Sequence, residues 1–192
     1  LSLSPILGDP SPTLAVARMG RPRIRAIHCS QSSGTQREGR VCLIAGSESG
    51  HVGDAVYAAA KRVIVSHQRE GDVRVLNADD PIVAGFEAAS TRRAFSLKGP
   101  ADAWAHDERI EMASGVIDVR GRMIPGWFNL QNMAAATLAA AAVWPGAAAV
   151  AREVFTTFPG VEHRLELVGE IGGVRYYNDS IATNPESTLA AL

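Results

Sequence analysis

Short apolar segments that alternate with helical patterns from Val41 onward constrain the fold more than any other feature of this sequence. Residues 41–45 form an apolar run bounded by glycines, which predicts a buried strand. Residues 52–67 then carry apolar side chains at helical spacing, and residues 73–76 predict a second strand. The order of strand, polar turn and helix is typical of a mainly parallel sheet covered by helices. We therefore expect an α/β fold.

Apolar periodicity and turn residues also predict the elements of the second half of the chain. In order, these are a helix over residues 82–88, short strands within 92–124, a long alanine-rich helix that opens at 126–132 and ends near Trp144, a second helix over 147–157, and strands over 164–168 and 174–177. Gly172 and Gly173 form a flexible turn between the last two strands, which predicts a hairpin. Asn184 and Pro185 are typical of the N-cap and first residue of a further helix.

Charge and composition exclude several classes of function. The formal net charge of −1 argues against a general polyanion binder, so we expect no nucleic-acid partner. The most apolar stretch, residues 134–151, consists mainly of weakly hydrophobic alanine and is interrupted by Pro145, so we expect no membrane span. Cys29 and Cys42 are too few for a disulfide framework, which favours a reducing compartment.

The first forty residues differ from the rest of the chain. They contain six arginines but only Asp9 and Glu38 as acidic residues, and four prolines interrupt them. This composition fits either a transit peptide or a non-native leader, and we expect residues 1–40 to be poorly ordered. The chain also begins with Leu1 rather than methionine and stops at Leu192 within a predicted helix. We therefore expect a piece of a longer protein.

Residues 177–185 form the polar segment that is most informative about function. Carboxylate, hydroxyl and amide groups, with Asp179 and Thr183 among them, lie between a strand end and a helix start. In an open α/β sheet ligands bind at that position, and the free N–H groups of a helix start favour an anion. A polar turn that only caps the helix is an equally good interpretation from spacing alone.

Three further groups are candidate ligand contacts. Asn129 and Asn132 are three residues apart at the start of the alanine-rich helix, so both amides can face one ligand, although helix capping by Asn129 is the alternative. Arg164, next to His163, carries a guanidinium suited to phosphate or to stacking on a base, although most such residues are only solvated. Lys61 follows three alanines, and a lone lysine on such a helix is usually a surface residue.

Four motifs in this order resemble the Mur ligase family. They are Asn77-Ala78-Asp79-Asp80, Gly126-x-x-Asn129-x-x-Asn132, the segment from Phe158 to Glu166, and the segment from Tyr177 to Asn184. The resemblance covers residues 52–192, and the last motif is most similar to that of the family member that adds D-glutamate. It implies an ATP-dependent ligase of peptidoglycan synthesis. In that reaction the carboxylate of UDP-N-acetylmuramoyl-L-alanine is activated as an acyl phosphate, and the amine of D-glutamate attacks it.

The resemblance also implies roles for individual residues. Asn132, Arg164 and Asp179 match family positions that hold the adenosine part of ATP. Asn129 lies at the neighbouring motif position, and Thr183 lies in the loop near the ligand. These residues are therefore the expected nucleotide contacts.

Lys61 matches the lysine that the family carbamylates to bind Mg²⁺, an ion that neutralises charge on the transferred phosphoryl group. The fold that the resemblance implies is the latter part of a mainly parallel-sheet ATPase domain over residues 41–159. The beginning of a Rossmann-like C-terminal domain follows over residues 160–192. The bacterial cytoplasm is the implied setting.

The sequence departs from the family pattern in its phosphate-binding and metal-binding elements. No G-x-x-x-x-G-K-[ST] loop is present, and residues 46–50 stand where an Asp-His-x-Asp element is expected. Phe128 replaces a histidine and Ile181 replaces a lysine. These residues also match neither the uridine-nucleotide-binding domain of the family nor most of its D-glutamate-binding domain. We therefore expect the missing domains of a longer parent chain to be partners of this chain.

We therefore expect a fragment of a D-glutamate-adding ligase that is inactive by itself. A noncatalytic remnant or nucleotide-binding module of the same fold is the alternative. A sibling ligase such as a folylpolyglutamate synthase is disfavoured by residues 178–184.

Overall fold

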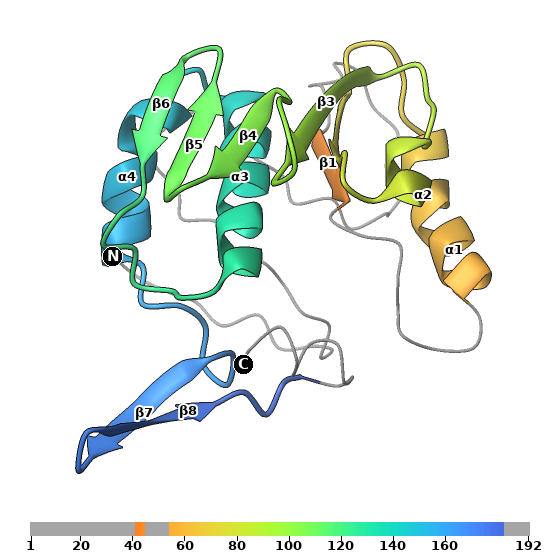
Figure 1. Cartoon of the computed structure of the whole chain (residues 1–192). Coiled ribbons are helices and arrows are strands. Elements are labelled where there is room, and N and C mark those ends of the chain that lie inside the picture. Colours follow the sequence, from red (N-terminus) through yellow and green to blue (C-terminus); the bar gives the residue numbers. More distant parts are fainter. Residues whose placement is uncertain (1–40, 45–53, 183–192) are drawn as a thin grey trace, which may run out of the picture. The chain divides into compact units, whose positions relative to one another are not determined.

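The computed structural model describes residues 41–44 and 54–182, which form a six-stranded sheet with its helices and a two-stranded hairpin (Figure 1). The strands of the sheet, in spatial order, are β1 (Val41–Ile44), β2 (Val73–Asn77), β3 (Thr91–Ser96), β4 (Ala103–His106), β5 (Arg109–Met112) and β6 (Gly115–Asp118). The helices are α1 (Asp54–Ser66), α2 (Pro81–Ala84), α3 (Trp127–Ala141) and α4 (Ala147–Thr157). The hairpin consists of β7 (Glu166–Ile171) and β8 (Val174–Asn178). The α/β class expected from the sequence is confirmed.

The sheet is parallel over its first four strands and antiparallel over its last three. β1, β2, β3 and β4 pair in parallel, whereas β4, β5 and β6 form an antiparallel meander. Asp107 and Glu108 join β4 to β5, and their φ angles of 46° and 57° are left-handed. Two such residues in succession form the tight turn that matches the twist of a hairpin. The sequence predicts the short strands of this region but not their direction.

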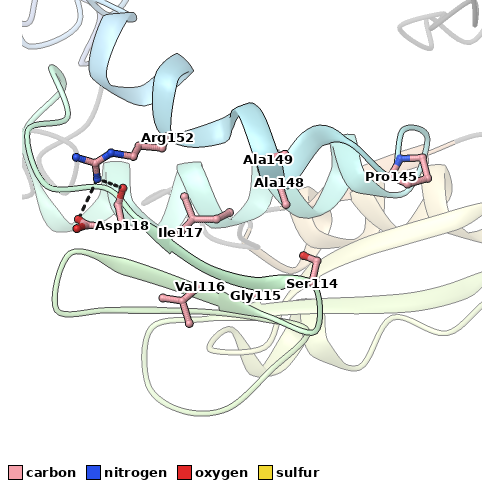
Figure 2. Close-up of a pocket in the computed structure, with 9 residues that line it drawn as sticks. All are labelled: Ser114, Gly115, Val116, Ile117, Asp118, Pro145, Ala148, Ala149 and Arg152. Carbon is pink, nitrogen blue, oxygen red and sulfur yellow. Dashed lines mark hydrogen bonds and ion pairs between the residues drawn. The ribbon is translucent and has the colours of Figure 1, made fainter.

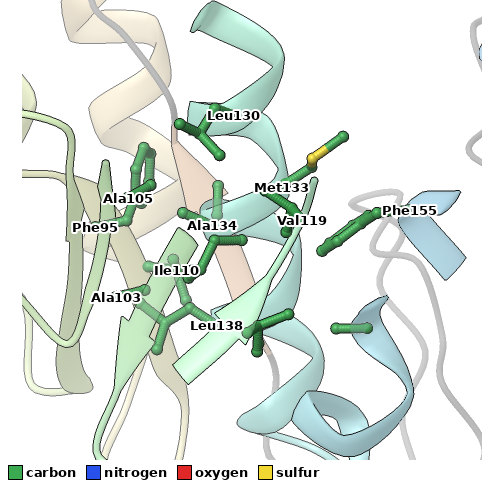
Figure 3. Close-up of a cluster of buried hydrophobic side chains, with 14 residues drawn as sticks. Phe95, Ala103, Ala105, Ile110, Val119, Leu130, Met133, Ala134, Leu138 and Phe155 are labelled. Atoms are coloured by element: carbon green, nitrogen blue, oxygen red, sulfur yellow. The ribbon is translucent and has the colours of Figure 1, made fainter. Parts of the chain in front are cut away.

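Helices cover both faces of the parallel part of the sheet, because successive side chains of a strand point to opposite faces. Val75 and Leu76 are neighbours in β2 and both are fully buried, yet they belong to different hydrophobic clusters. The Val75 cluster includes side chains of α3 and α4 (Figure 3). The Leu76 cluster includes Val65 of α1 and Val83 of α2. Helices on both faces of a mainly parallel sheet are typical of α/β proteins.

The helix α3 begins near the carboxyl end of β4 and contacts β1 to β4. Glu108 lies two positions beyond the end of β4, and its carboxylate pairs with Arg122 in the segment that leads into α3. Because a helix of 15 residues is about 22 Å long, the other end of α3 lies toward the amino ends of the strands. The start of α3 therefore lies at the edge of the sheet where ligands bind in open α/β proteins.

The predicted helix over residues 82–88 is too long. The helix α2 ends at Ala84, because the chain turns at Gly85, whose N–H donates to the carbonyl oxygens of Ile82 and Val83. Phe86 then enters the core beside Val83. The following segment is held outside a helix by Arg74, whose Nη1 donates to the carbonyl oxygen of residue 88 at 3.2 Å.

The helix α4 and the turn of the hairpin agree with the predictions, whereas β7 begins two residues later and ends three residues later than the strand expected over residues 164–168. The bounds of α4 are those expected, since glycine and proline residues flank it. β7 and β8 pair around Gly172 and Gly173, whose φ angles of 60° and 80° are left-handed. A C-terminal domain is expected over residues 160–192, and the hairpin is the part of it that the structure describes as regular elements. The predicted helix start at Asn184 lies outside the described residues. Residues 1–40 also lie outside them. Among the helices of residues 54–182, none is both long and apolar enough to cross a membrane.

Candidate functional site

Two asparagine side chains at the start of α3 are hydrogen-bonded to each other. Asn132 Nδ2 donates to Asn129 Oδ1 at 3.3 Å, and Asn129 Nδ2 donates to the carbonyl oxygen of Pro125 at 2.6 Å. The two amides therefore share one face of the helix, as their spacing predicts. Capping by Asn129 is wrong, because the N-cap is Gly126 and no side chain caps this helix end.

The outer amide of this pair remains able to bind a ligand. Asn129 is buried, whereas Asn132 is exposed and keeps one amide N–H and its Oδ1 for further partners. A donor and an acceptor on one planar amide are complementary to adenine, which offers a ring-nitrogen acceptor beside an amino donor. The first turn of α3 contains no acidic residue, so its N-terminus also favours a negatively charged group. The amide pair can therefore recognise an adenine ring.

The segment before α3 is fixed by Arg122. Its Nε and Nη2 donate to the two carboxylate oxygens of Glu108, each at 2.8 Å, and only 12% of the Arg122 side chain is exposed. Its hydrogen bonds hold the pKa of Glu108 below the usual range. The sequence analysis missed both residues, because they are 14 positions apart and no local pattern connects them.

Hydrogen bonds join the loop that contains Arg164 to the loop that contains Asp179. Asp179 Oδ1 accepts a hydrogen bond from the N–H of Leu165 at 3.1 Å, and the N–H of Ile181 donates to the carbonyl oxygen of His163 at 3.2 Å. Asp179 is half-buried, whereas Arg164 is exposed. These contacts hold the backbone on both sides of an exposed guanidinium.

The backbone beside Arg164 has an uncommon conformation. His163 and Leu165 have φ angles of 65° and 47°, which side-chain-bearing residues rarely adopt. Side chains support this loop: Asn178 Nδ2 lies 2.9 Å from His163 Nδ1, and the N–H of His163 donates to Glu166 Oε2 at 2.8 Å. Strained backbone that its surroundings hold in place is common at ligand-binding loops.

Lys61 lies on the inward side of α1. It is half-buried, and it stands between Ala58 and Val65, which are both buried at helical spacing. Within the described residues, no group of three or more His, Cys, Asp or Glu side chains could hold a metal ion.

The predicted site residues form two separate groups of contacts, one at the start of α3 and one beside the hairpin. The contacts of Asn129 and Asn132 stay within the α3 segment, and those of Asp179 stay within the loops beside the hairpin. Thr183 and residues 46–50 lie outside the described residues.

A shallow groove between β6 and α4 contains none of the predicted site residues (Figure 2). It is lined by Ser114, Gly115, Val116, Ile117, Asp118, Pro145, Ala148, Ala149 and Arg152. Its two charged groups pair with each other, since Arg152 Nη1 lies 3.2 Å from Asp118 Oδ1 and also donates to the Asp118 carbonyl oxygen at 2.6 Å. Arg120 pairs with the same carboxylate, and its hydrogen bonds hold the pKa of Asp118 well below the usual range. The groove therefore offers no uncompensated charge to a ligand.

Solved structures of Mur ligases share this fold. A crystal structure of MurF from Acinetobacter baumannii matches with a TM-score of 0.67 and 22% identity, over 78% of this chain and 36% of that one. A second crystal structure of the same protein matches with a TM-score of 0.64. The fold of the matched part is thus that of a Mur ligase. No protein-family model matches the chain.

More similar sequences belong to the D-glutamate-adding ligases. The UDP-N-acetylmuramoylalanine–D-glutamate ligase of Roseiflexus sp. (strain RS-1) is 42% identical over an alignment of 153 residues, and the match covers 71% of this chain and 33% of that protein. The ligase of the same name from Geobacillus kaustophilus is 43% identical over 143 residues. The chain spans about a third of the length of these curated relatives. The resemblance to the Mur ligase family, and within it to the member that adds D-glutamate, is confirmed for this part.

Proposed function

We propose that this chain is the adenine-nucleotide-binding part of an ATP-dependent ligase that joins D-glutamate to UDP-N-acetylmuramoyl-L-alanine in peptidoglycan synthesis. The observation that carries the proposal is the Asn129–Asn132 amide pair at the start of α3, at the ligand-binding edge of the sheet. The relatives that match this part are named for that ligation.

In the proposed site, three side chains hold the adenosine part of ATP. Asn132 offers its amide to the adenine ring, and the exposed guanidinium of Arg164 is suited to stacking on the base or to binding a phosphate. Asp179 accepts hydrogen bonds from the ribose hydroxyls, as carboxylates do in other nucleotide sites. Thr183 completes the loop near the ligand. The bacterial cytoplasm is the proposed setting.

The proposed magnesium ligand is a carbamate on Lys61. The ammonium of Lys61 first gives one proton to the solvent, and the neutral amine then attacks CO2 and releases a second proton, so that a carboxylate-like carbamate replaces the ammonium. Mg²⁺ is commonly bound by one or two such oxygens together with nucleotide phosphates and water. The ion, when bound, neutralises charge on the transferred phosphoryl group.

The carbamate is tested by NMR with 13C-labelled CO2. We expect a carbamate carbonyl signal in the wild-type chain that is lost in Lys61→Arg, while Lys98→Arg, at an exposed lysine, keeps it. An identical signal in Lys61→Arg would contradict the proposal.

The domain division is also proposed. Residues 41–159 belong to the central ligase domain, and residues 160–192 begin the C-terminal domain. The other domains of a longer ligase are then the partners of this chain.

Nucleotide binding is tested by titrating the full 192-residue chain with ADP and, as a control for the base, with UDP. We expect ADP to bind more tightly than UDP, and Asn132→Ala to weaken ADP binding about tenfold. Gln131→Ala, on the neighbouring position of α3, is the matched control and leaves binding unchanged. Equal affinity for ADP and UDP would contradict adenine recognition.

Ligation is tested by phosphate release from ATP. Because the 192 residues contain no G-x-x-x-x-G-K-[ST] loop to hold the phosphates, we expect no release by this chain alone. Phosphate release that depends on both D-glutamate and UDP-N-acetylmuramoyl-L-alanine would show that these residues suffice for catalysis.

A second candidate is a noncatalytic remnant of the same fold that binds adenine nucleotides without turnover. The DNA on either side of this sequence discriminates between the two. An upstream reading frame that encodes a G-K-[ST] loop supports the ligase, whereas a start codon and a stop codon at these ends support the remnant.

A further inference from the structure

We propose that Arg122 is a positioning residue for the nucleotide site: it fixes the start of α3 so that Asn129 and Asn132 face the adenine ring. This inference rests on the proposed function of the amide pair.

An ion pair with Glu108 holds the guanidinium of Arg122. Both carboxylate oxygens accept a hydrogen bond at 2.8 Å, so the guanidinium is held in distance and in orientation. The Arg122 side chain is 12% exposed and that of Glu108 is 41% exposed, so solvent reaches the pair from the carboxylate side while the guanidinium is largely buried. Glu108 is itself held in the tight turn between β4 and β5, so the ion pair anchors Arg122 to the carboxyl end of the sheet.

Arg122 also forms hydrogen bonds with the backbone before α3. Its Nη1 donates to the carbonyl oxygens of Ile124 at 2.6 Å and of Gly126 at 3.2 Å. The carbonyl oxygen between them, that of Pro125, accepts the hydrogen bond from Asn129 Nδ2 at 2.6 Å. Three successive carbonyl groups are thus fixed by one guanidinium and one amide.

The backbone before α3 in turn orients the amides of Asn129 and Asn132. The Pro125 carbonyl sets the orientation of the Asn129 amide, and Asn129 Oδ1 in turn accepts from Asn132 Nδ2. Gly126 makes the turn into α3 with a φ of 92°, and a Cβ there would lie 2.7 Å from the Phe128 ring. The turn therefore needs glycine, and Arg122 holds the turn in place.

Among the described residues, Glu108 is the carboxylate that pairs with Arg122. Asp118, the other carboxylate of this region, pairs with Arg120 and Arg152 on the exposed side of β6. Arg120 is therefore a matched control: it is an arginine two positions away, in an exposed ion pair, without a described contact to residues 124–126.

The test measures ADP affinity and the structure of the amide pair in the full 192-residue chain. We expect Arg122→Met to weaken ADP binding about tenfold and Arg122→Lys to weaken it less, because lysine keeps the charge but not the two-pronged geometry. Arg120→Met leaves affinity unchanged. In an Asn132→Ala background, Arg122→Met has little further effect, because Arg122 acts through the amide pair. The side-chain amide NMR signals of Asn129 and Asn132 shift in Arg122→Met and stay in place in Arg120→Met.

Unchanged amide signals in Arg122→Met, or an effect on ADP affinity that is fully additive with Asn132→Ala, would overturn the inference. If Arg122→Met does not fold, Glu108→Gln is the second variant, since it keeps the shape of the partner but removes its charge and one of the two oxygens that accept from Arg122. If the wild-type chain binds no ADP, the proposed function fails, and the amide signals still decide whether Arg122 fixes the pair.

Discussion

His106 lies between two carboxylates and against an aromatic ring. Its Nδ1 is 3.1 Å from Asp107 Oδ2, its Nε2 is 3.1 Å from Glu111 Oε1, and its ring stacks on Trp104 with centroids 3.9 Å apart. The hydrogen bond with Asp107 is the main cause that raises the pKa of His106, with Glu111 adding to it. The protonated form is therefore favoured in the folded state.

The raised pKa of His106 predicts a pH-dependent contribution to stability. A folded-state pKa above the unfolded value of about 6.5 stabilises the fold below that pH, and this contribution is lost as the pH rises through the folded pKa. We expect His106→Gln to destabilise the chain more at about pH 5.5 than at about pH 8.5 in urea unfolding. Glu111→Gln, which removes one partner, reduces this difference. An equal loss at both pH values would contradict the prediction.

At the residue scale, the sequence predicts side chains that are close along the chain and misses those that are not. The spacing of Asn129 and Asn132 is sufficient to place their amides on one face of a helix. The pairing of Glu108 with Arg122 depends on the hairpin of β5 and β6 between them, and this hairpin is a tertiary feature. Local spacing carries no information about such a pair.

At the element scale, predictions succeeded where turn residues mark both ends of an element. The bounds of α4 follow from the glycine and proline residues around it, and the hairpin follows from Gly172 and Gly173. The helix α2 was predicted too long, because apolar periodicity continues to Phe86, although that side chain enters the core after the turn at Gly85. The turn at Gly85, and the burial of Phe86 after it, end this helix.

The short helix α2 depends on its N-cap. Asp80 accepts hydrogen bonds from the N–H groups of Ile82 at 2.9 Å and Val83 at 3.0 Å. We expect Asp80→Ala to lower the free energy of unfolding by about 1 kcal/mol, and Asp80→Asn, another good N-cap, to lower it less. Chemical denaturation measures both variants. Equal losses in the two variants would indicate that the carboxylate charge, and not the cap, is responsible.

At the scale of the whole molecule, the sheet joins two hydrophobic clusters that lie on its opposite faces. Cys42 belongs to the cluster of α1 and α2, and Leu138 of α3 belongs to the other. The mainly parallel sheet was predicted from the alternation of strands and helices. The antiparallel direction of β4 to β6 was not, because hairpin pairing depends on turns such as Asp107-Glu108 that the hydrophobic pattern does not specify.

Cys42 reports whether the two clusters unfold together. It is buried, and burial raises the pKa of its thiol to about 11, so the reactive thiolate forms only when the structure opens. In a Cys29→Ser background, we expect Leu138→Ala, which costs about 2–5 kcal/mol, to accelerate labelling of Cys42 by a thiol reagent although it lies on the opposite face. Exposed Val116→Ala is the control and has little effect. If the rate of Cys42 labelling is the same in Leu138→Ala as in the parent, the two faces of the sheet open independently.

Intermolecular NMR contacts in the ADP complex test whether the amide pair at the start of α3 recognises adenine. We predict nuclear Overhauser effects between the adenine ring protons and the side-chain amide protons of Asn132, at the exposed end of the pair. If the adenine protons contact Val116 and Ala149, in the groove between β6 and α4, and none contacts Asn132, the amide pair does not recognise adenine.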